Sequence, residues 1–336
     1  MIKKKNIELI DFLKGFSIFT IVIYHLLQLL KMPAIIHKFI AFGGTGVHTF
    51  IFISGFGLYL SYLNKPIGFV NFVKKRFIKI YIPYIIIVSF VALISLLIPL
   101  YPNSWYAYFG HLLFYKMFDE SIIGSYGYQL WFISSIVQFY LFFYIFVALK
   151  NKLKNSHFLI LGFVISLVWS MIVVYFGKED LRIWNSFFPQ FIWEFFLGMI
   201  LANLYFTKGK EIWDTKIVYL FVIASIGLLL YSLLALKFGS LGKMFNDIPA
   251  FFGYTTIGIL LYKLNLKWIN SFILYIASIS YSLYLIHMFV IKTGMLVFNN
   301  MHISYNFLYL VLLLLISIFF SVYLEKVLKF IYNKMN

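Results

Sequence analysis

Three histidines, His25, His48 and His287, are the residues of this chain best suited to proton or acyl transfer. A neutral imidazole can take a proton from a hydroxyl group, or it can carry an acyl group itself. Each of the three falls near one end of a long apolar segment. The chain has no cysteine, which excludes catalysis by a thiolate and excludes disulfides.

Two other interpretations of these histidines stay open at this point. Imidazole is comfortable near the interface between a membrane and water, so three unrelated histidines would give the same pattern. Three histidines can also bind a metal, but the sequence has no ligand-spacing motif. We therefore predict no metal site and favour a functional role for at least His25.

The segment 7–30 carries His25 on a stripe of polar residues. In an α-helix, at 100° per residue, these side chains fall within about 140° of one another, on one face. The residues are Asp11, Lys14, Ser17, Tyr24, His25 and Gln28. Ionisable side chains inside a membrane span are costly and usually face the interior of a bundle or a wet cavity. The stripe therefore predicts the start of an active site.

Cationic residues gather where a later apolar segment begins, within residues 73–83. Arg76 and Lys79 are three residues apart and share a helical face. Ordinary anchoring by positive charge on the cytoplasmic side explains Lys74 and Lys75. Clustered Arg and Lys at the mouth of a bundle can also hold a phosphate. On the sequence alone both interpretations stay open.

The spacing along the first helix favours a long anionic substrate. Lys14 precedes His25 by about 16 Å of helix and lies on nearly the same face. Coenzyme A has a fitting shape, with phosphates at one end and a thioester at the tip of its arm. Asp11 is about 21 Å from His25, too far to orient that imidazole directly. We expect Asp11 to pair with Lys14, or with Arg76 or Lys79 on another helix.

The composition is that of an all-α integral membrane protein. The 336 residues are 63% hydrophobic and 12% charged, whereas soluble domains are about half apolar and about a quarter charged. We predict about ten transmembrane helices in one bundle. Their approximate ranges are 10–30, 46–63, 79–99, 130–149, 157–176, 187–206, 216–236, 248–263, 271–291 and 305–325.

Positive charge is distributed unevenly between the two sides of the membrane. The loops on the N-terminal side carry more than twice as many Lys and Arg residues as the others. We therefore predict that both termini are cytoplasmic. The same bias accounts for the net charge of +17 without a nucleic-acid partner. The first apolar segment follows Lys3, Lys4 and Lys5, and we predict that it is retained rather than cleaved as a signal peptide.

No soluble domain is expected, so residues 1–336 form a single transmembrane domain. Residues 101–128, rich in Tyr, Ser and Gly, are too broken for a span. We predict an interfacial loop there, because aromatic residues favour the depth of the lipid headgroups.

Five stretches carry a family pattern when they are taken in order. They are Ile10-Asp-Phe-Leu-Lys-Gly15 with His25, Gly43-Gly-Thr-Gly-Val-His-Thr-Phe-Ile-Phe-Ile-Ser-Gly-Phe56, Arg76-Phe-Ile-Lys-Ile-Tyr-Ile-Pro83, Leu130-Trp-Phe-Ile with Tyr140, and Ser280-Tyr-Ser-Leu-Tyr-Leu-Ile-His287. Each stretch alone is a weak signal. Together they resemble the membrane acyltransferase 3 family, whose members O-acetylate or otherwise O-acylate bacterial cell-surface glycans.

The resemblance implies a ten-span enzyme that uses cytoplasmic acyl-CoA, usually acetyl-CoA, with no permanently bound cofactor. It implies that His25 is the catalytic histidine, and that Asp11 of the same opening motif is a catalytic residue with it. The resemblance also implies that the donor is bound by Lys14, Arg76 and Lys79. The residues expected to bind substrate or to support the site are Trp131, Tyr140, Tyr281, His287 and His48.

The chain departs from the family pattern at several positions. Lys14 and Lys79 stand where the family commonly has Arg, so the charge is kept but the planar bidentate fork is lost. Gln138 stands where some members have Glu. We also expect the form of the family without its optional extracytoplasmic hydrolase-like domain.

We thus expect transfer of an acetyl group to a hydroxyl of a surface polysaccharide, or of its lipid-linked precursor, at the bacterial cytoplasmic membrane. His25 serves either as a base or as an acyl carrier. The rival function is transport of a polysaccharide or lipid-linked glycan. Few charges within the spans, and no paired broken helices, count against transport. The acceptor glycan and the oligomeric state are left open.

Overall fold

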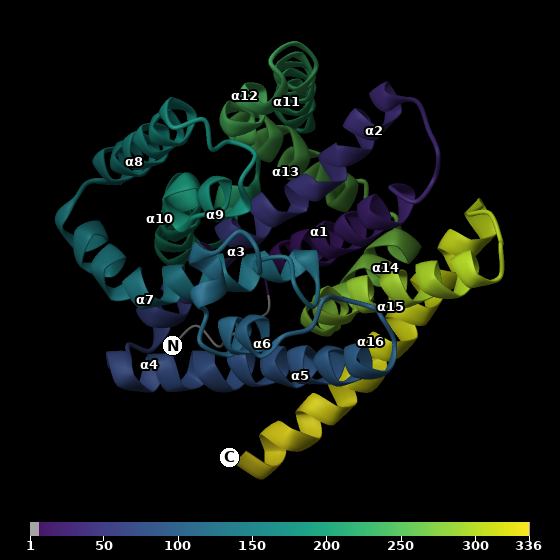
Figure 1. The fold of residues 1–336 in the computed structure, drawn as a ribbon. Helices are drawn as coiled ribbons and strands as arrows, with labels where there is room; N and C mark the ends of the chain where they lie inside the picture. The colour runs from purple at the N-terminus through teal and green to yellow at the C-terminus, as the bar shows by residue number, and fades with distance from the viewer. Residues whose placement is uncertain (1–6, 336) are drawn as a thin grey trace.

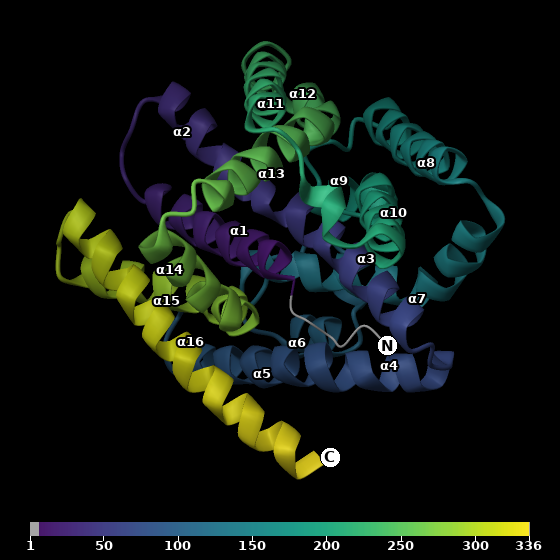
Figure 2. The ribbon, with the colours of Figure 1, turned by 180° about the vertical axis from the view of Figure 1, so that it is seen from behind.

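The computed structural model describes residues 7–335, and in this part of the chain all regular structure is helical (Figures 1 and 2). The prediction of an all-α fold is therefore confirmed. Lys3, Lys4 and Lys5, whose charges entered the prediction of cytoplasmic termini, lie outside the described residues. The orientation of the termini stays a prediction.

The helices are named as in Figure 1. The α-helices are α1 (Glu8–Leu27), α2 (Ala34–Ile40), α3 (Gly46–Asn64), α4 (Phe69–Arg76), α5 (Ile82–Leu97), α6 (Trp105–Leu112), α7 (Trp131–Lys152), α8 (Asn155–Tyr175), α9 (Arg182–Asn185), α10 (Ile192–Lys208), α11 (Ile217–Lys237), α12 (Gly239–Phe245), α13 (Asp247–Lys263), α14 (Lys267–Ser278), α15 (Ser280–Asn300) and α16 (Phe307–Met335). Short 3₁₀ turns are η1 (Ala41–Thr45), η3 (Tyr115–Phe118), η4 (Tyr128–Leu130), η5 (Phe188–Phe191) and η6 (Gly209–Trp213). A π-helical turn, η2 (Phe77–Tyr81), joins α4 to α5.

Within residues 7–335, eight helical segments are long and apolar enough to cross a bilayer. They are Glu8–Leu27, Ala34–Asn64, Phe69–Leu97, Tyr128–Lys152, Asn155–Tyr175, Ile217–Lys237, Ser280–Asn300 and Phe307–Lys334. The two other predicted spans correspond to α10 and α13, which have 17 residues each. That length is at the lower limit of roughly 17 residues for a span. The chain is thus a multi-pass membrane protein, and eight helical segments in its described part reach full spanning length.

The predicted span 271–291 was placed wrongly along the chain. α14 ends at Ser278 and α15 begins at Ser280, so two helices divide this apolar run. α14 packs against α1, whereas α15 pairs with α16. Hydropathy does not reveal such a break, because both helices are apolar.

α1 lies in the middle of the bundle, in contact with α3, α13, α14, α15 and α16 (Figures 1 and 2). Its large apolar side chains are buried in the protein core, among them Phe12, Leu13, Ile18 and Val22. α14 comes so close that a Cβ at Gly15 would lie 2.1 Å from the carbonyl oxygen of Ile273.

α3 and α10 pack against each other through two glycines. A Cβ at Gly55 would lie 2.2 Å from the carbonyl oxygen of Phe195, and one at Gly198 would lie 2.2 Å from that of Phe52. Small residues at such crossings let two backbones approach closely inside a membrane. The contact sets the beginning of α3 beside the beginning of α10, and with them the polar residues described below.

Residues 101–128 do not lie at the interface as predicted, but return along α5 as a hairpin. The carbonyl of Ala92 accepts a hydrogen bond from Asn103 at 2.8 Å. Further along α6, the carbonyl of Leu112 accepts one from Tyr81 at 2.6 Å. Tyr81 is about 24 Å along the helix from the end of α5 at Leu97. The hairpin therefore reaches deep beside the span, because its polar side chains find partners there.

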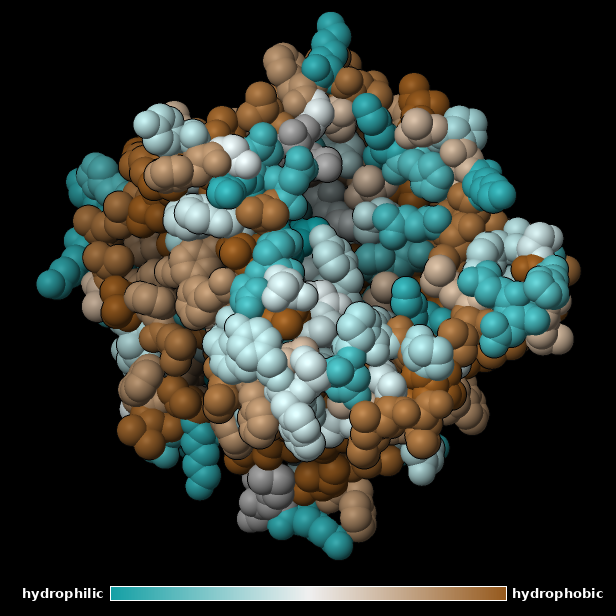
Figure 3. All heavy atoms as spheres, in the orientation of Figure 1, coloured by the Kyte–Doolittle hydropathy of each residue, from teal (hydrophilic) through white to brown (hydrophobic). Residues whose placement is uncertain are grey.

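The outward surfaces of α8, α11 and α16 are apolar. They expose large side chains such as Ile160, Leu229 and Leu315. In Figure 3, hydrophobic side chains form most of the margin, and hydrophilic ones surround a hollow near the middle of that face. Exposed apolar flanks of this extent suit contact with lipid.

The glycine contact between α3 and α10 can be tested by substitution. Gly198→Ala should lower the free energy of unfolding by about 1–3 kcal/mol, because the added methyl meets backbone that has to move. Gly57→Ala on α3 is the control, since a Cβ there meets nothing within 4 Å. The melting temperature of the solubilised protein measures both. Equal effects of the two variants would contradict close packing at Gly198.

Candidate active site

His25 of α1 and His287 of α15 lie side by side, with ring centres 5.5 Å apart. They come from helices whose sequence positions differ by more than 250 residues, and the contact between α1 and α15 brings them together. Nδ1 of His25 is 3.3 Å from Oε1 of Gln28, one turn further along α1. Because that oxygen accepts, Nδ1 carries the proton and Nε2 keeps its lone pair.

His287 is held in one tautomer by the backbone of its own helix. Its Nδ1 is 2.9 Å from the carbonyl oxygen of Leu283 and 3.0 Å from that of Tyr284. Carbonyl oxygens only accept hydrogen bonds, so Nδ1 donates and Nε2 is again the bare nitrogen. This Nε2 is fully buried and has no hydrogen-bond partner among residues 7–335. The site therefore holds two imidazoles that can each accept a proton.

A cavity of about 160 Å³, called here the His25 cavity, opens beside His25. Gln129, Trp131 and Tyr284 contribute to its wall. Tyr284 donates a hydrogen bond to the backbone carbonyl of Gln129 at 2.6 Å, which fixes turn η4 against α15. The wall of this cavity contains His25 with Trp131, a residue named from the sequence, and with Tyr284, which the sequence analysis quoted only as part of the 280–287 motif.

Arg182 lies at the edge of the His25 cavity, against two aromatic rings. Its guanidinium carbon is 4.9 Å from the ring centres of Tyr128 and of Trp131. Its Nε donates to the Tyr128 hydroxyl at 2.7 Å, and Nη1 donates to Oγ of Ser186 at 3.0 Å. Stacking and hydrogen bonds together hold the planar guanidinium in one orientation.

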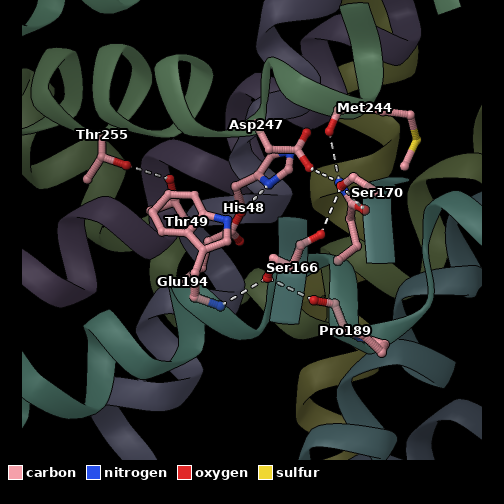
Figure 4. A network of polar contacts seen from close by, with 11 residues as sticks. His48, Thr49, Ser166, Ser170, Pro189, Glu194, Met244, Asp247 and Thr255 are labelled. Atoms are coloured by element: carbon pink, nitrogen blue, oxygen red, sulfur yellow. Dashed lines mark hydrogen bonds and ion pairs between the residues drawn. The ribbon is translucent and has the colours of Figure 1, made fainter. Parts of the chain in front are cut away.

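His48 belongs to a different polar network from that of His25 (Figure 4). Its Nδ1 is 2.7 Å from Oε1 of Glu194, and its Nε2 is 3.6 Å from Oδ1 of Asp247. Gln190 donates to the other oxygen of Asp247 at 2.8 Å and accepts from Ser170 at 3.0 Å. The three histidines therefore do not form one cluster, although two of them do meet.

The His48 network lines a second cavity of about 290 Å³, called here the Asp247 cavity. This cavity and the His25 cavity share part of their walls. The shared residues are Gly44, Val47, Tyr128, Trp131 and Arg182. The two spaces are neighbours, and the stacked pair of Arg182 and Trp131 lies where they meet.

A third pocket, of about 370 Å³, lies at the opposite end of α3 and is called here the Arg76 pocket. Its wall includes Arg76 with Lys65 and Lys75, which gives it three positive charges. The guanidinium carbon of Arg76 is 5.4 Å from the ring centre of Phe72 and 5.8 Å from that of Tyr140. Arg76 and Tyr140, which the sequence analysis named for separate roles, therefore lie against each other.

The other cations predicted for the donor lie elsewhere. Lys14 on α1 interacts electrostatically with Asp11, as predicted, and also with Glu325 of α16. Glu325 in turn accepts a hydrogen bond from Ser282 at 2.7 Å. Lys79 has an exposed side chain in the π-helical turn η2, and it is not part of the wall of the Arg76 pocket.

Tyr281 links the π-helical turn to the histidine pair. Its hydroxyl donates to the carbonyl of Ile80 at 2.6 Å. His287 follows it by six residues on α15, which is about 9 Å of helix. The His25 cavity and the Arg76 pocket nevertheless share no wall residue. Phe50 lines the His25 cavity and Gly57 lines the Arg76 pocket, and these two residues are about 10 Å apart along α3.

Two features stand out in this protein: a multi-pass helical bundle, and a cavity lined by His25, whose ring lies beside the buried ring of His287. A family model described as an acyltransferase domain matches residues 7–326. The chain therefore belongs to the acyltransferase 3 family and is a membrane acyltransferase. The family suggests an acyl-CoA donor. No curated protein and no solved structure matches the chain.

Several residues of these sites escaped the sequence analysis. Glu194 had a signal, because it is an acidic residue inside a predicted span and such residues are costly there. Asp247 and Arg182 gave none, since each stands at a helix start next to an ordinary polar loop. Glu325 stands at the end of the last predicted span, where a charged residue is ordinary, so its role as a partner of Lys14 was not recognised. Only the packing of distant helices reveals their partners.

The buried contact between His48 and Glu194 predicts non-additive stability effects. We expect His48→Leu and Glu194→Leu each to lower the free energy of unfolding by about 3–5 kcal/mol, because each leaves a buried polar partner unpaired. The double variant should be little worse than either single one. Melting temperatures of the three proteins measure this, with the exposed His157→Leu as control. Additive losses would contradict the pairing.

Proposed function

We propose that this protein is an O-acetyltransferase, which moves an acetyl group from cytoplasmic acetyl-CoA to a hydroxyl of a bacterial cell-surface polysaccharide or of its lipid-linked precursor. It acts in the bacterial cytoplasmic membrane as a single domain with both termini in the cytoplasm. The observation that carries the proposal is the pair of imidazoles with bare Nε2 atoms beside a cavity, at the other end of α3 from a basic pocket.

The Arg76 pocket supports binding of the donor from the cytoplasmic side. Three cations line it, and the phosphates of coenzyme A are strong acceptors for charged donors. Arg76 is held between Phe72 and Tyr140, so its fork is already oriented for a bidentate contact. Lys14 and Lys79 are outside the wall of this pocket, and in this proposal they contact the donor at other points.

The donor has to cross the stretch of protein between the Arg76 pocket and the His25 cavity. Phe132 closes the His25 cavity at this side, with its ring centre 5.8 Å from that of Tyr284 and 6.2 Å from that of Phe50. Aromatic side chains of this kind can swing aside without breaking hydrogen bonds of the backbone. The arm therefore enters by displacing them, and their return around the bound arm keeps water away from the thioester.

His25 carries the chemistry by one of two routes. In the first, the acceptor hydroxyl attacks the thioester carbon, its proton moves to Nε2 of His25, the carbon–sulfur bond breaks, and the imidazolium returns the proton to the departing thiolate. In the second, Nε2 of His25 attacks the thioester carbon, the carbon–sulfur bond breaks, and the coenzyme A thiolate leaves the acetyl group on the imidazolium. The acceptor hydroxyl then attacks the acetyl carbon, the carbon–nitrogen bond breaks to free the imidazole, and the hydroxyl proton ends on the thiolate. His287 offers a second proton acceptor beside it. Asp11 acts on Lys14 rather than on the imidazole.

Removal of the imidazole tests this function. His25→Ala should lower acetyl transfer by roughly 10²–10⁴-fold or more, because the imidazole in the cavity wall is lost and His287 is not part of that wall. The measurement is radiolabelled acetyl transferred from acetyl-CoA to glycan in inverted membrane vesicles. The exposed His157→Ala is the matched control and should keep full activity. Full transfer by His25→Ala would contradict the proposal, and glycan movement without any acetyl ester would indicate a transporter.

If the Arg76 pocket binds the donor, a change there should affect the KM for acetyl-CoA alone. Arg76→Ala should raise the KM for acetyl-CoA by about tenfold to a hundredfold, the range of a lost charge-assisted hydrogen bond. The KM for acetyl-CoA of Arg76→Lys should fall between those of the unmodified protein and Arg76→Ala, because lysine keeps the charge and lacks the planar fork of the guanidinium. Lys74→Ala, an exposed neighbour outside the pocket wall, serves as control. An unchanged KM for acetyl-CoA in Arg76→Ala would place the donor elsewhere.

A further inference from the structure

The Asp247 cavity differs in chemistry from the other two spaces of the molecule. Its wall is dominated by planar polar side chains, namely Glu179, Asn185, Gln190 and Asp247, with Arg182 and His48. Carboxylates and amides of this kind exchange hydrogen bonds with hydroxyl groups, and a carboxylate acceptor makes the stronger bond. The volume, about 290 Å³, is close to the roughly 300 Å³ at which small-molecule sites begin.

The same cavity has aromatic surface beside the polar groups. Trp131, Tyr128 and Phe191 contribute rings to its wall. A pyranose ring has apolar C–H faces and a rim of hydroxyls, so it needs such a ring surface as well as hydrogen-bonding groups around it. Tyr and Trp supply rigid apolar area with a polar tip.

The polar groups of the wall are arranged before any ligand arrives. Gln190 holds one oxygen of Asp247, and His48 lies 3.6 Å from the other. The completely buried Glu194 contacts the other ring nitrogen of His48, Nδ1, at 2.7 Å (Figure 4). One carboxylate oxygen of Glu179 is buried and accepts no hydrogen bond from any residue in the described range. Glu179 therefore brings to the wall a carboxylate whose hydrogen-bonding capacity the described residues do not fill.

Charge gives the cavity a preference among sugars. Its wall holds Glu179, Asp180 and Asp247 against Arg182 and His48. The guanidinium of Arg182 is already engaged by Tyr128 and Ser186, and His48 lies between two carboxylates. Together with the buried Glu194 beside His48, the carboxylates around this cavity outnumber the cations, so an acidic sugar would add like charge there, whereas an uncharged or amino sugar would not.

We propose that the Asp247 cavity is the subsite that holds a sugar unit of the acceptor, and that it selects units without negative charge. The inference rests on the proposed function and extends it to the class of acceptor. The cavity shares Trp131 and Arg182 with the His25 cavity. A sugar in the Asp247 cavity can therefore extend a hydroxyl past this pair toward His25, which fits transfer to a polymer that enters opposite the donor.

Binding of defined sugars in the absence of donor tests the inference. The full-length protein in lipid nanodiscs is titrated with galactotetraose, glucosamine tetramer and tetragalacturonate, and binding is followed by saturation-transfer NMR. The galactotetraose is α-1,4-linked, like tetragalacturonate, so the two differ only at carbon 6 and isolate the effect of negative charge. We expect the uncharged and cationic tetramers to bind at least tenfold more tightly than tetragalacturonate, because like charges are juxtaposed in its complex.

Variants of the wall locate the subsite. Glu179→Gln should weaken binding of galactotetraose several-fold, and Glu179→Lys should reduce the preference against tetragalacturonate. Glu179 lies in a loop, so neither change disturbs a helix contact. Glu211→Gln, an exposed carboxylate in η6 outside the cavity wall, is the matched control and should bind all three sugars as the unmodified protein does.

The outcomes separate the two proposals. Tighter binding of tetragalacturonate, equal binding by the Glu179 variants, or no binding of any tetramer by a protein that transfers acetyl would overturn the sugar subsite and leave the proposed function standing. Selective sugar binding at this cavity by a protein that transfers no acetyl would support the subsite and overturn the proposed function alone.

Discussion

The free-energy cost of a polar side chain inside an apolar bundle governs this structure. Each such group needs a protein partner, a cavity or a ligand, because lipid offers none. The contact of His48 with Glu194 shows the constraint most clearly, since a fully buried carboxylate depends on an imidazole from another helix. That contact in turn depends on Gly55 and Gly198, which let α3 and α10 touch. Packing of small residues thus decides where polar chemistry is tolerated.

The same constraint divides the molecule into two ends joined by a few helices. At one end of α3 lie the paired histidines and the Asp247 cavity, and at the other lies the basic Arg76 pocket. α1 and α15 run between these ends, with Lys14 and Tyr281 toward one and His25 and His287 toward the other. Such a division suits a reaction whose two substrates arrive from opposite sides of a membrane. The separation of the two ends also keeps the thioester of the bound donor away from water while the acceptor is being bound.

Much of this arrangement was predictable from the sequence, and the exceptions have physical causes. The polar stripe on α1 and the cationic cluster near Arg76 are local patterns, so one helix suffices to recognise them. The break at Ile279 between α14 and α15 leaves no trace in hydropathy, and the hairpin beside α5 depends on partners such as Ala92 and Tyr81. The separation of His48 from His25 is a matter of which helices pack together, and sequence distance carries no information about that.

The central claim is that the donor's thioester reaches His25 from the Arg76 pocket. A structure determined by electron cryomicroscopy with a non-hydrolysable acetyl-CoA analogue bound tests it most directly. The account predicts phosphate density against Arg76, an arm passing Phe132 in a displaced position, and the carbonyl of the analogue within reach of Nε2 of His25. Phosphates bound at the Asp247 cavity, or an arm that ends away from both histidines, would contradict it.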